Sequence, residues 1–149
     1  MPRPPAYAGF QVTFDAADPD RVARFWALAL TYEMEPPPEG FDSWPAALEA
    51  YGVPENQWGS KSAIIDPDGV GPRVFFQQVP EGKTVKNRVH LDVRSARGED
   101  LSPEDADSAR NAHVARLEAA GAEVVEHRTE MGGAFVVMRD IEGNEFCVS

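Results

Sequence analysis

The sequence predicts an α+β fold in which one module of a strand, a helix and further strands is used twice. Residues 10–15 and 88–93 each alternate apolar and polar side chains with period two, the pattern of an amphipathic strand. Each is followed by a helical pattern and then by strands joined at a turn rich in Asp and Gly. The two leading strands are 79 positions apart, at Gln11 and His90, and the two turns are 74 positions apart, which favours a duplicated module over chance.

The first half begins with the strand at residues 10–15 and continues into a helix. Asp18 offers an N-cap and Pro19 occupies a position where helices tolerate proline, so we expect the helix to begin there and to end before Pro36. Its apolar side chains recur at helical spacing and predict a buried side: Val22, Phe25, Trp26, Ala29 and Leu30.

The rest of the first half predicts a hairpin after an irregular segment. Residues 61–65 and 73–79 form two strand patterns on either side of the sequence Asp-Pro-Asp-Gly, which has strong turn residues. Residues 36–60 predict a short helix near residues 44–51 and a loop that carries Trp58.

The second half repeats this order of elements. Ser102 and Pro103 predict a capped helix start, and Gly121 predicts its end. Three strands are then expected, at residues 123–127, 135–138 and 145–148, with an Asp-Ile-Glu-Gly turn between the last two.

Length and charge narrow the class of protein. With 149 residues, 42% of them hydrophobic, the chain is expected to form one domain, with one module at about residues 8–80 and the other at about 87–149. The net charge of −11 argues against binding to nucleic acid or to an anionic membrane surface. No sequence typical of a phosphate-binding glycine loop or of a hydrolase nucleophile occurs.

The compartment expected is the cytoplasm. Cys147 is the single cysteine, so no intrachain disulfide can form, as is usual in a reducing compartment. The first ten residues lack the pattern of an export signal, and no apolar stretch reaches the length of a membrane span.

Side-chain alternation predicts which face of the sheet holds the site. In the leading strands Phe10, Val12, Phe14, Val89, Leu91 and Val93 are expected to pack on the helices. The same alternation in the last strand places Phe146 and Val148 on the helix side. The opposite, concave face is then polar and carries Gln11, Thr13, Asp15, Gln77, His90, Asp92, Glu145 and Cys147.

The motifs at residues 11–26, 72–77, 86–92 and 143–148 together resemble the glyoxalase-like branch of the vicinal oxygen chelate superfamily, which includes glyoxalases, bleomycin resistance proteins and dioxygenases. The resemblance covers nearly the whole chain except residues 36–60. It implies two βαβββ modules that form a cupped mixed sheet, helices on the outer face, a small-molecule pocket on the concave face, and often a homodimer.

The resemblance also implies where a divalent metal would bind. Matched position by position, the four ligand sites of metal-dependent members fall on Gln11, Gln77, His90 and Cys147. Two glutamines, a histidine and a cysteine are an unusual set for a hard cation, although a thiolate could bind zinc. The glutamate that serves glyoxalase I as ligand and base is replaced by Cys147, so we expect neither true glyoxalase I activity nor a stoichiometric metal.

Several candidate residues have a second, structural interpretation. His90 suits a binding or general-base role, and Glu145 could replace the missing carboxylate. Trp58 could close over a ligand or simply pack under its loop. Lys83, Lys86 and Arg88 could meet an anionic group or form a solvated loop, whereas His113, His127 and a small buried Cys147 are expected to be structural.

Two functions therefore remain open. The first is metal-independent binding of a small molecule, as in superfamily members that sequester an antibiotic in an acidic dimer. The second is a lyase, isomerase or dioxygenase that acts on a small oxygenated substrate through His90 and a metal or a carboxylate.

Overall fold

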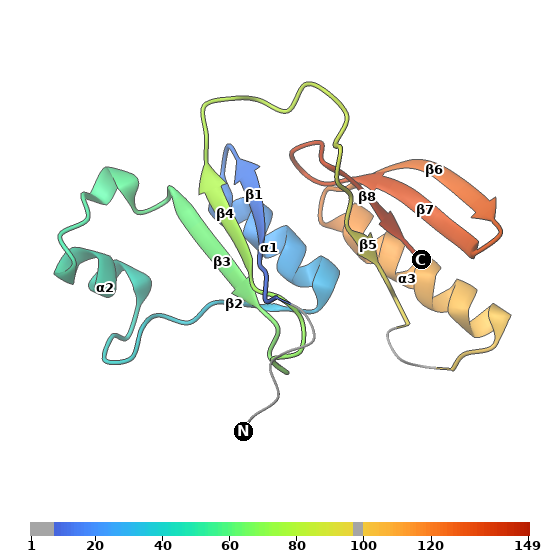
Figure 1. Cartoon of the computed structure of the whole chain (residues 1–149), viewed down its shortest axis with the longest axis horizontal. Coiled ribbons are helices and arrows are strands. Elements are labelled where there is room, and N and C mark those ends of the chain that lie inside the picture. The colour runs from blue at the N-terminus through green and yellow to red at the C-terminus, as the bar shows by residue number, and fades with distance from the viewer. Residues whose placement is uncertain (1–7, 97–99) are drawn as a thin grey trace.

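The chain folds into two modules that lie side by side, each a four-stranded mixed sheet with a helix packed on one face (Figure 1). The computed structural model describes residues 8–96 and 100–149. The first module contains β1 (Val12–Ala16), α1 (Pro19–Leu30), β2 (Glu33–Met34), α2 (Trp44–Ala50), a 3-10 turn (Glu55–Gln57), β3 (Lys61–Ile65) and β4 (Val74–Gln78). The second contains β5 (Asp92–Val93), α3 (Pro103–Ala119), β6 (Glu123–Glu130), β7 (Gly133–Arg139) and β8 (Glu145–Val148).

The two sheets have the same topology. Their strand orders are β1-β4-β3-β2 and β5-β8-β7-β6. In each sheet the first strand runs parallel to the last, and the other neighbours are antiparallel. This is the βαβββ arrangement, and it confirms the predicted duplication.

Helix α1 begins and ends as its sequence predicts. Asp18 is the N-cap and its carboxylate accepts a hydrogen bond from the Arg21 N–H at 3.3 Å, while Pro19 fills the first turn. Thr31 ends the helix in the left-handed conformation, with φ of 57°. The side that packs on β1, β3 and β4 is the predicted apolar one.

Helix α3 has the predicted bounds but buries fewer side chains. Ser102 Oγ accepts a hydrogen bond from the Asp105 N–H at 3.1 Å, and the chain leaves the helix through Gly121, whose φ is +107°. Only His113, Val114 and Leu117 are fully buried along the helix.

An aromatic cluster joins the two modules into one core. Phe14 and Phe76 of the first sheet stack at 5.3 Å, and Phe14 meets Trp26 of α1 at 5.0 Å. Trp26 in turn packs edge-on against Phe146 of β8 at 4.9 Å. Because aromatic side chains bury large apolar areas, this contact ties the stability of each module to the other.

The alternation in β1 is confirmed except at its start. Val12 and Phe14 pack against the core on the helix side, and Thr13 and Asp15 are exposed on the opposite face. Phe10 was predicted to face the helix, but it precedes the strand and is 68% exposed.

The second leading strand is much shorter than predicted. The strand expected at residues 88–93 comprises only Asp92 and Val93. These two residues pair with β8, where Cys147 N–H donates to Leu91 O and Ser149 N–H donates to Val93 O. Val89 was expected to pack on the helix side and is instead 79% exposed. Residues 79–91, called the strap below, cross from one module to the other outside either sheet (Figure 1).

Smaller differences concern strand ends. β6 extends to Glu130 and carries a bulge between Val124 and Glu126, and β7 begins at Gly133 rather than two residues later. The two-residue strand β2, which pairs with β3, has no signal in the sequence because its single apolar residue, Met34, gives no alternation.

Residues 36–60 form an arm that lies on the side of the first module farther from the second (Figure 1). The predicted short helix is α2, and Phe41 packs edge-on against Tyr51 at 5.5 Å. The indole N–H of Trp58 donates to Val53 O at 2.9 Å, and that of Trp44 donates to Glu35 O at 2.8 Å. Trp58 thus stabilises the arm itself, and Trp44 holds the arm to the residue that precedes it.

None of the helices in the described ranges is both long enough and apolar enough to cross a membrane.

Candidate functional site

Glu145, at the start of β8, holds the strap in place. One carboxylate oxygen accepts the backbone N–H of Asn87 at 2.9 Å, and Lys83 Nζ lies 3.2 Å from the same oxygen. The side-chain amide of Asn87 donates a hydrogen bond from Nδ2 to Glu145 O at 3.3 Å. Burial alone would raise the pKa of Glu145, but the backbone N–H groups and Lys83 outweigh it and lower the pKa to about 2. The carboxyl group is therefore ionised at neutral pH.

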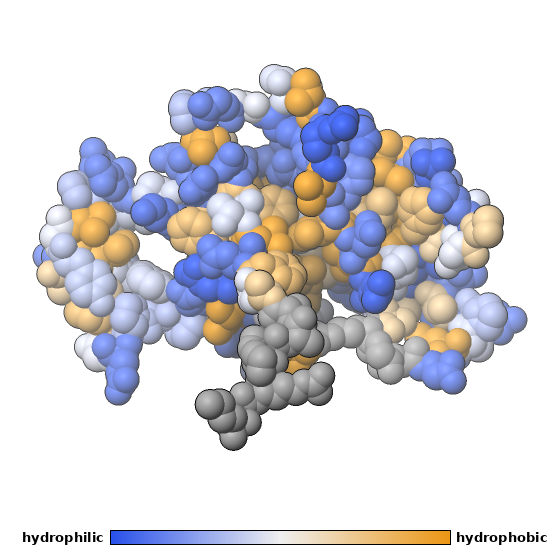
Figure 2. Space-filling model, viewed as in Figure 1, coloured by the Kyte–Doolittle hydropathy of each residue, from blue (hydrophilic) through white to orange (hydrophobic). Residues whose placement is uncertain are grey.

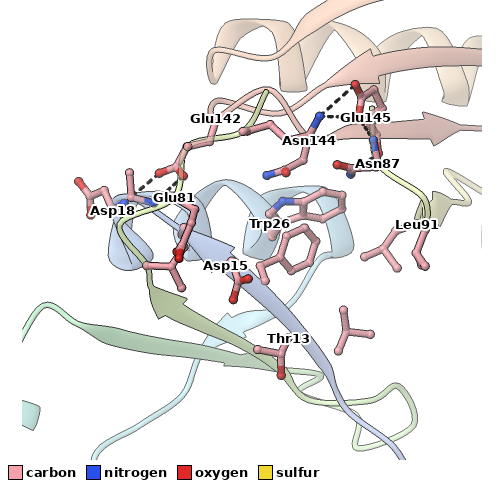
Figure 3. A pocket seen from close by; sticks show the side chains of 18 of the residues that line it. Thr13, Asp15, Asp18, Trp26, Glu81, Asn87, Leu91, Glu142, Asn144 and Glu145 are labelled. Carbon is pink, nitrogen blue, oxygen red and sulfur yellow. Dashed lines mark hydrogen bonds and ion pairs between the residues drawn. The ribbon is translucent and has the colours of Figure 1, made fainter. Parts of the chain in front are cut away.

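The strap encloses a cavity of about 650 Å³ between the two modules, the seam cavity (Figure 3). Its walls come from β1, α1, the strap, the β7–β8 turn and the start of β8. The apolar part of its lining consists of Val12, Phe14, Ala16, Ala17, Trp26, Val79, Val89 and Leu91. Figure 2 shows apolar surface at the middle of this face of the molecule, with hydrophilic side chains around it.

Acidic side chains dominate the polar part of the seam cavity. Five carboxylates line it against two cations: Asp15, Asp18, Glu81, Glu142 and Glu145 against Arg21 and Lys83. Glu142 is fixed by hydrogen bonds from the other module, and Asp15 by its register partner on the adjacent strand β4. Glu142 accepts the backbone N–H groups of Ala17 at 2.7 Å and Asp18 at 2.9 Å, and Asp15 accepts Gln77 Nε2 at 2.7 Å. The cavity thus joins an apolar base to a negatively charged rim.

A second cavity, the face cavity, has a volume of about 750 Å³ and lies on the face of the second sheet opposite α3. Phe135, Val137 and Cys147 contribute to its floor, since the alternate residues Val136, Met138 and Phe146 are buried on the helix side. The strap lies along its edge with Lys83, Lys86 and His90. Lys83 and Glu145 line both cavities.

His90 occupies the face cavity, on the opposite side of the strap from Val89 and Leu91, which line the seam cavity. His90 thus lies on the other side of the chain from Val89 and Leu91, but in the strap rather than in a strand, and the prediction that Val89 packs on the helix side is wrong. The exposed imidazole has Nε2 at 2.7 Å from Lys86 Nζ and at 3.1 Å from Asn87 O.

Cys147 is half-buried beside Asp92, its register partner in β5. Burial, and then the carboxylate of Asp92, raise the pKa of the Cys147 thiol, while the charges of Lys86 and Arg128 oppose the rise. The thiol is therefore protonated at neutral pH.

The structure brings together only part of the residue set proposed from the sequence. Thr13, Asp15 and Glu145 line the seam cavity, and His90, Glu145 and Cys147 line the face cavity. Asp92 lies beside Cys147, exposed at the seam edge of its sheet. Three others line neither cavity: Gln11, Gln77 and Trp58.

Sequence reasoning missed the strap and the turn that faces it. Asn87, Val89 and Glu142 line the seam cavity, although the sequence placed Val89 in a strand and Glu142 in a turn and assigned none of the three to a site. One pattern could have indicated the strap. Val89 and Leu91 are two positions apart at the end of the polar stretch that connects the modules, so their side chains point to the same side of an extended chain.

The four positions matched to metal ligands do not fit a metal. Gln11 Oε1 accepts a hydrogen bond from Arg73 Nη1 at 3.2 Å, Gln77 donates to Asp15, and His90 contacts Lys86. Within residues 8–96 and 100–149, no group of three or more His, Cys, Asp or Glu side chains could hold a metal ion. These four positions also include no carboxylate to balance the charge of a hard divalent cation, and their one sulfur is a protonated thiol.

Residues 11–149 match the family model of the glyoxalase-like domain. The chain belongs to this family. With it, the chain belongs to the glyoxalase, bleomycin resistance and dioxygenase superfamily, and its paired βαβββ modules are consistent with the fold of that superfamily. No curated protein matches this glyoxalase-like chain in sequence.

Solved structures similar to this glyoxalase-like chain cover nearly all of it. The fosfomycin resistance protein FosX from Listeria monocytogenes, in complex with Mn(II) and 1S,2S-dihydroxypropylphosphonic acid, has 12% identity and a TM-score of 0.58 over 95% of this chain and 89% of that one. A glyoxalase/bleomycin resistance/dioxygenase family enzyme from Burkholderia phytofirmans has 14% identity and a TM-score of 0.57 over 93% and 94%. A possible glyoxalase from Bacillus cereus has 13% identity and a TM-score of 0.56 over 96% and 98%. At these identities the similarity shows the fold alone.

Proposed function

We propose that this glyoxalase-like protein binds a small molecule in the seam cavity without a metal ion. The observation that carries the proposal is the seam cavity itself, where an apolar base meets a charged rim at the junction of two modules. Its volume of about 650 Å³ is in the range typical of sites for small organic ligands.

The state of Glu145 supports binding over proton transfer. A group that moves protons at neutral pH works best with a pKa near that pH. The pKa of Glu145 is about 2, and its oxygens already hold the strap through Asn87 and Lys83. We therefore assign Glu145 a positioning role, in place of the catalytic role considered from the sequence.

The charge of the lining indicates the class of ligand. With five carboxylates and two cations around an apolar base, the seam cavity favours a ligand that combines an apolar ring with a positive charge. Among the carboxylates, Glu81 is exposed and belongs to the strap, where it can approach a ligand that enters from solvent.

The proposal can be tested with a pair of probe molecules. Calorimetric titration of metal-free protein should show binding of benzyltrimethylammonium, weaker binding of the neutral benzyl alcohol, and no change on addition of EDTA. Leu91→Trp, which fills the cavity, should abolish binding, and Glu81→Gln should weaken it about threefold. Val70→Trp and Glu39→Gln make the same changes at exposed positions outside both cavities and should retain parental affinity.

Two results would overturn the proposal. One is probe binding that Leu91→Trp leaves intact, which would place the site elsewhere. The other is binding that appears only after a divalent metal is added, which would favour the metal-dependent enzyme instead.

A further inference from the structure

A third cavity, the helix cavity, lies where the C-terminal end of α1 meets β5 and α3. Its volume is about 290 Å³, and both helices contribute to its walls, so it lies on the helix side of the sheets. It shares no lining residue with the seam cavity or the face cavity. Two arginines line it, Arg94 after β5 and Arg116 of α3, against one carboxylate, Asp92. In a chain with a net charge of −11, this excess of cations needs a physical reason.

Neither arginine of the helix cavity has a carboxylate partner within residues 8–96 and 100–149. The exposed Arg94 forms no ion pair there, and Arg116 donates instead to the ring of His113. Five other arginines of the chain each form an ion pair with a carboxylate: Arg24, Arg73, Arg110, Arg128 and Arg139. The two guanidinium groups of the helix cavity therefore keep their charge and most of their N–H groups available to a ligand.

His113 holds Arg116 in position. The buried imidazole donates from Nε2 to Ala29 O at 2.8 Å, and its Nδ1 accepts from Arg116 Nη2 at 2.9 Å. Because the N–H groups of a guanidinium lie in one plane, this single bond orients the others while using only one of them. Arg116 is thus fixed before any ligand arrives, which lowers the entropy cost of binding.

The end of helix α1 does not account for the two arginines. The last carbonyl groups of an α-helix lack partners within the helix, and nearby cations often bond to them. Here the carbonyl groups of Ala27, Leu28 and Ala29 already accept hydrogen bonds, the first two from the backbone N–H groups of residues 32 and 31 and the third from His113. The guanidinium groups are therefore not needed as caps of the helix.

We propose that the helix cavity is a second binding site, specific for a phosphate group, either as the free ion or in a small phosphate monoester. Arg94 and Arg116 donate to the phosphate oxygens, for which the planar guanidinium is well suited, and Thr31 adds a hydroxyl group to the lining. Asp92 opposes any anion, but it is exposed and is outnumbered by the two cations, so a dianion gains more here than a singly charged carboxylate does.

Calorimetric titration of the full chain with inorganic phosphate, at about pH 8 where phosphate is doubly charged, tests this site against acetate at equal ionic strength. Phosphate should bind at least about tenfold more tightly than acetate, and Arg94→Gln and Arg116→Gln should each weaken phosphate binding about tenfold. Arg88→Gln is the matched control, because Arg88 is exposed, lines none of the three cavities and has no carboxylate partner among the described residues. It should change the affinity by less than about twofold.

Two further measurements separate a binding site from a structural role of the arginines. Asp92→Asn removes the one carboxylate of the lining and should tighten phosphate binding about threefold, which a purely structural cluster would not do. Phenyl phosphate distinguishes the sources of the phosphate group. Affinity equal to or above that of inorganic phosphate assigns the site to a monoester, and lower affinity assigns it to the free ion. Circular dichroism melts establish that each variant is folded.

Equal affinities for phosphate and acetate, no measurable phosphate binding, or equal losses in the site variants and Arg88→Gln would overturn the proposal. So would weaker binding in Asp92→Asn, or a loss of binding in Arg128→Gln in place of the site variants, which would place the phosphate in the face cavity. Leu91→Trp should leave phosphate affinity unchanged, so a failure of the seam cavity as a site and a failure of the helix cavity give different results.

Discussion

The indole N–H of Trp26, in α1 of the first module, donates a 2.9 Å hydrogen bond to a carboxylate oxygen of Asp140, in the β7–β8 turn of the second. Both side chains are buried, with 1% and 4% of their surface exposed. Asp140 also accepts the backbone N–H groups of Glu142 and Asn144, each at 2.9 Å. One carboxylate therefore fixes the turn and docks it on the helix of the other module.

Asp140→Ala should lower the free energy of unfolding by about 2–4 kcal/mol, because it leaves the buried Trp26 N–H and two turn N–H groups without partners. Asp20→Ala, which removes an exposed carboxylate of α1, should cost less than about 1 kcal/mol. Urea denaturation of both variants measures the difference. Equal stabilities would show that the turn keeps its docking without the carboxylate.

We expect the two modules to unfold together, as one domain. The contact of Trp26 with Phe146 and the bond to Asp140 give each module part of the other's core. Thermal unfolding followed by near-UV and far-UV circular dichroism should then give coincident single transitions. Two separated transitions would contradict the assignment of one domain.

His113 and His90 should respond differently to truncation. His113 is buried, its Nε2–H donates to Ala29 O at 2.8 Å, and its Nδ1 accepts from Arg116 Nη2 at 2.9 Å. His113→Ala should therefore cost about 2–3 kcal/mol of stability. His90 is exposed, so His90→Ala should keep a near-parental melting temperature. A large loss of stability in His90→Ala would show that His90 has a structural role rather than a role in ligand binding.

Acid should loosen the strap. Because the folded-state pKa of Glu145 is depressed from 4.5 to about 2, the ionised carboxylate stabilises the folded state above pH 4.5, and this contribution is lost as the pH falls towards 2. The unfolding free energy of the parent protein should therefore decline more steeply between pH 5 and 2 than that of Glu145→Gln. Parallel pH profiles would show that Glu145 does not hold the strap in solution.

We also propose that the protein is a homodimer, as the family resemblance implies. Strand β6 lies at the edge of its sheet with eight residues and one partner strand, which leaves a long edge for a second chain. Light scattering should report twice the mass of the chain. A constant monomer mass across a hundredfold range of concentration would reject the dimer.

The sequence predicts the regular elements well because their signals are local. The cap at Asp18, the proline after it and the apolar spacing define α1, and Ser102 does the same for α3. The strap could not be predicted, since residues 88–91 alternate as a strand does and only the absence of a pairing strand makes them a crossing. For the same reason the sequence correctly places His90 on the opposite side from Val89 and Leu91. It cannot show that the two sides line two different cavities.

The bonds from Glu142 to the backbone of Ala17 and Asp18 have a consequence for synthesis of the chain. Glu142 places a negative charge at the N-terminus of α1, where the helix dipole favours it, across 125 positions of sequence. When the first module leaves the ribosome, that helix end has its Asp18 cap but lacks the charge of Glu142, and Trp26 has no Phe146 to pack against. Such non-local contacts slow folding and expose apolar surface in the meantime. The nascent N-terminal half therefore reaches its native packing only after the β7–β8 turn and β8 have been synthesised.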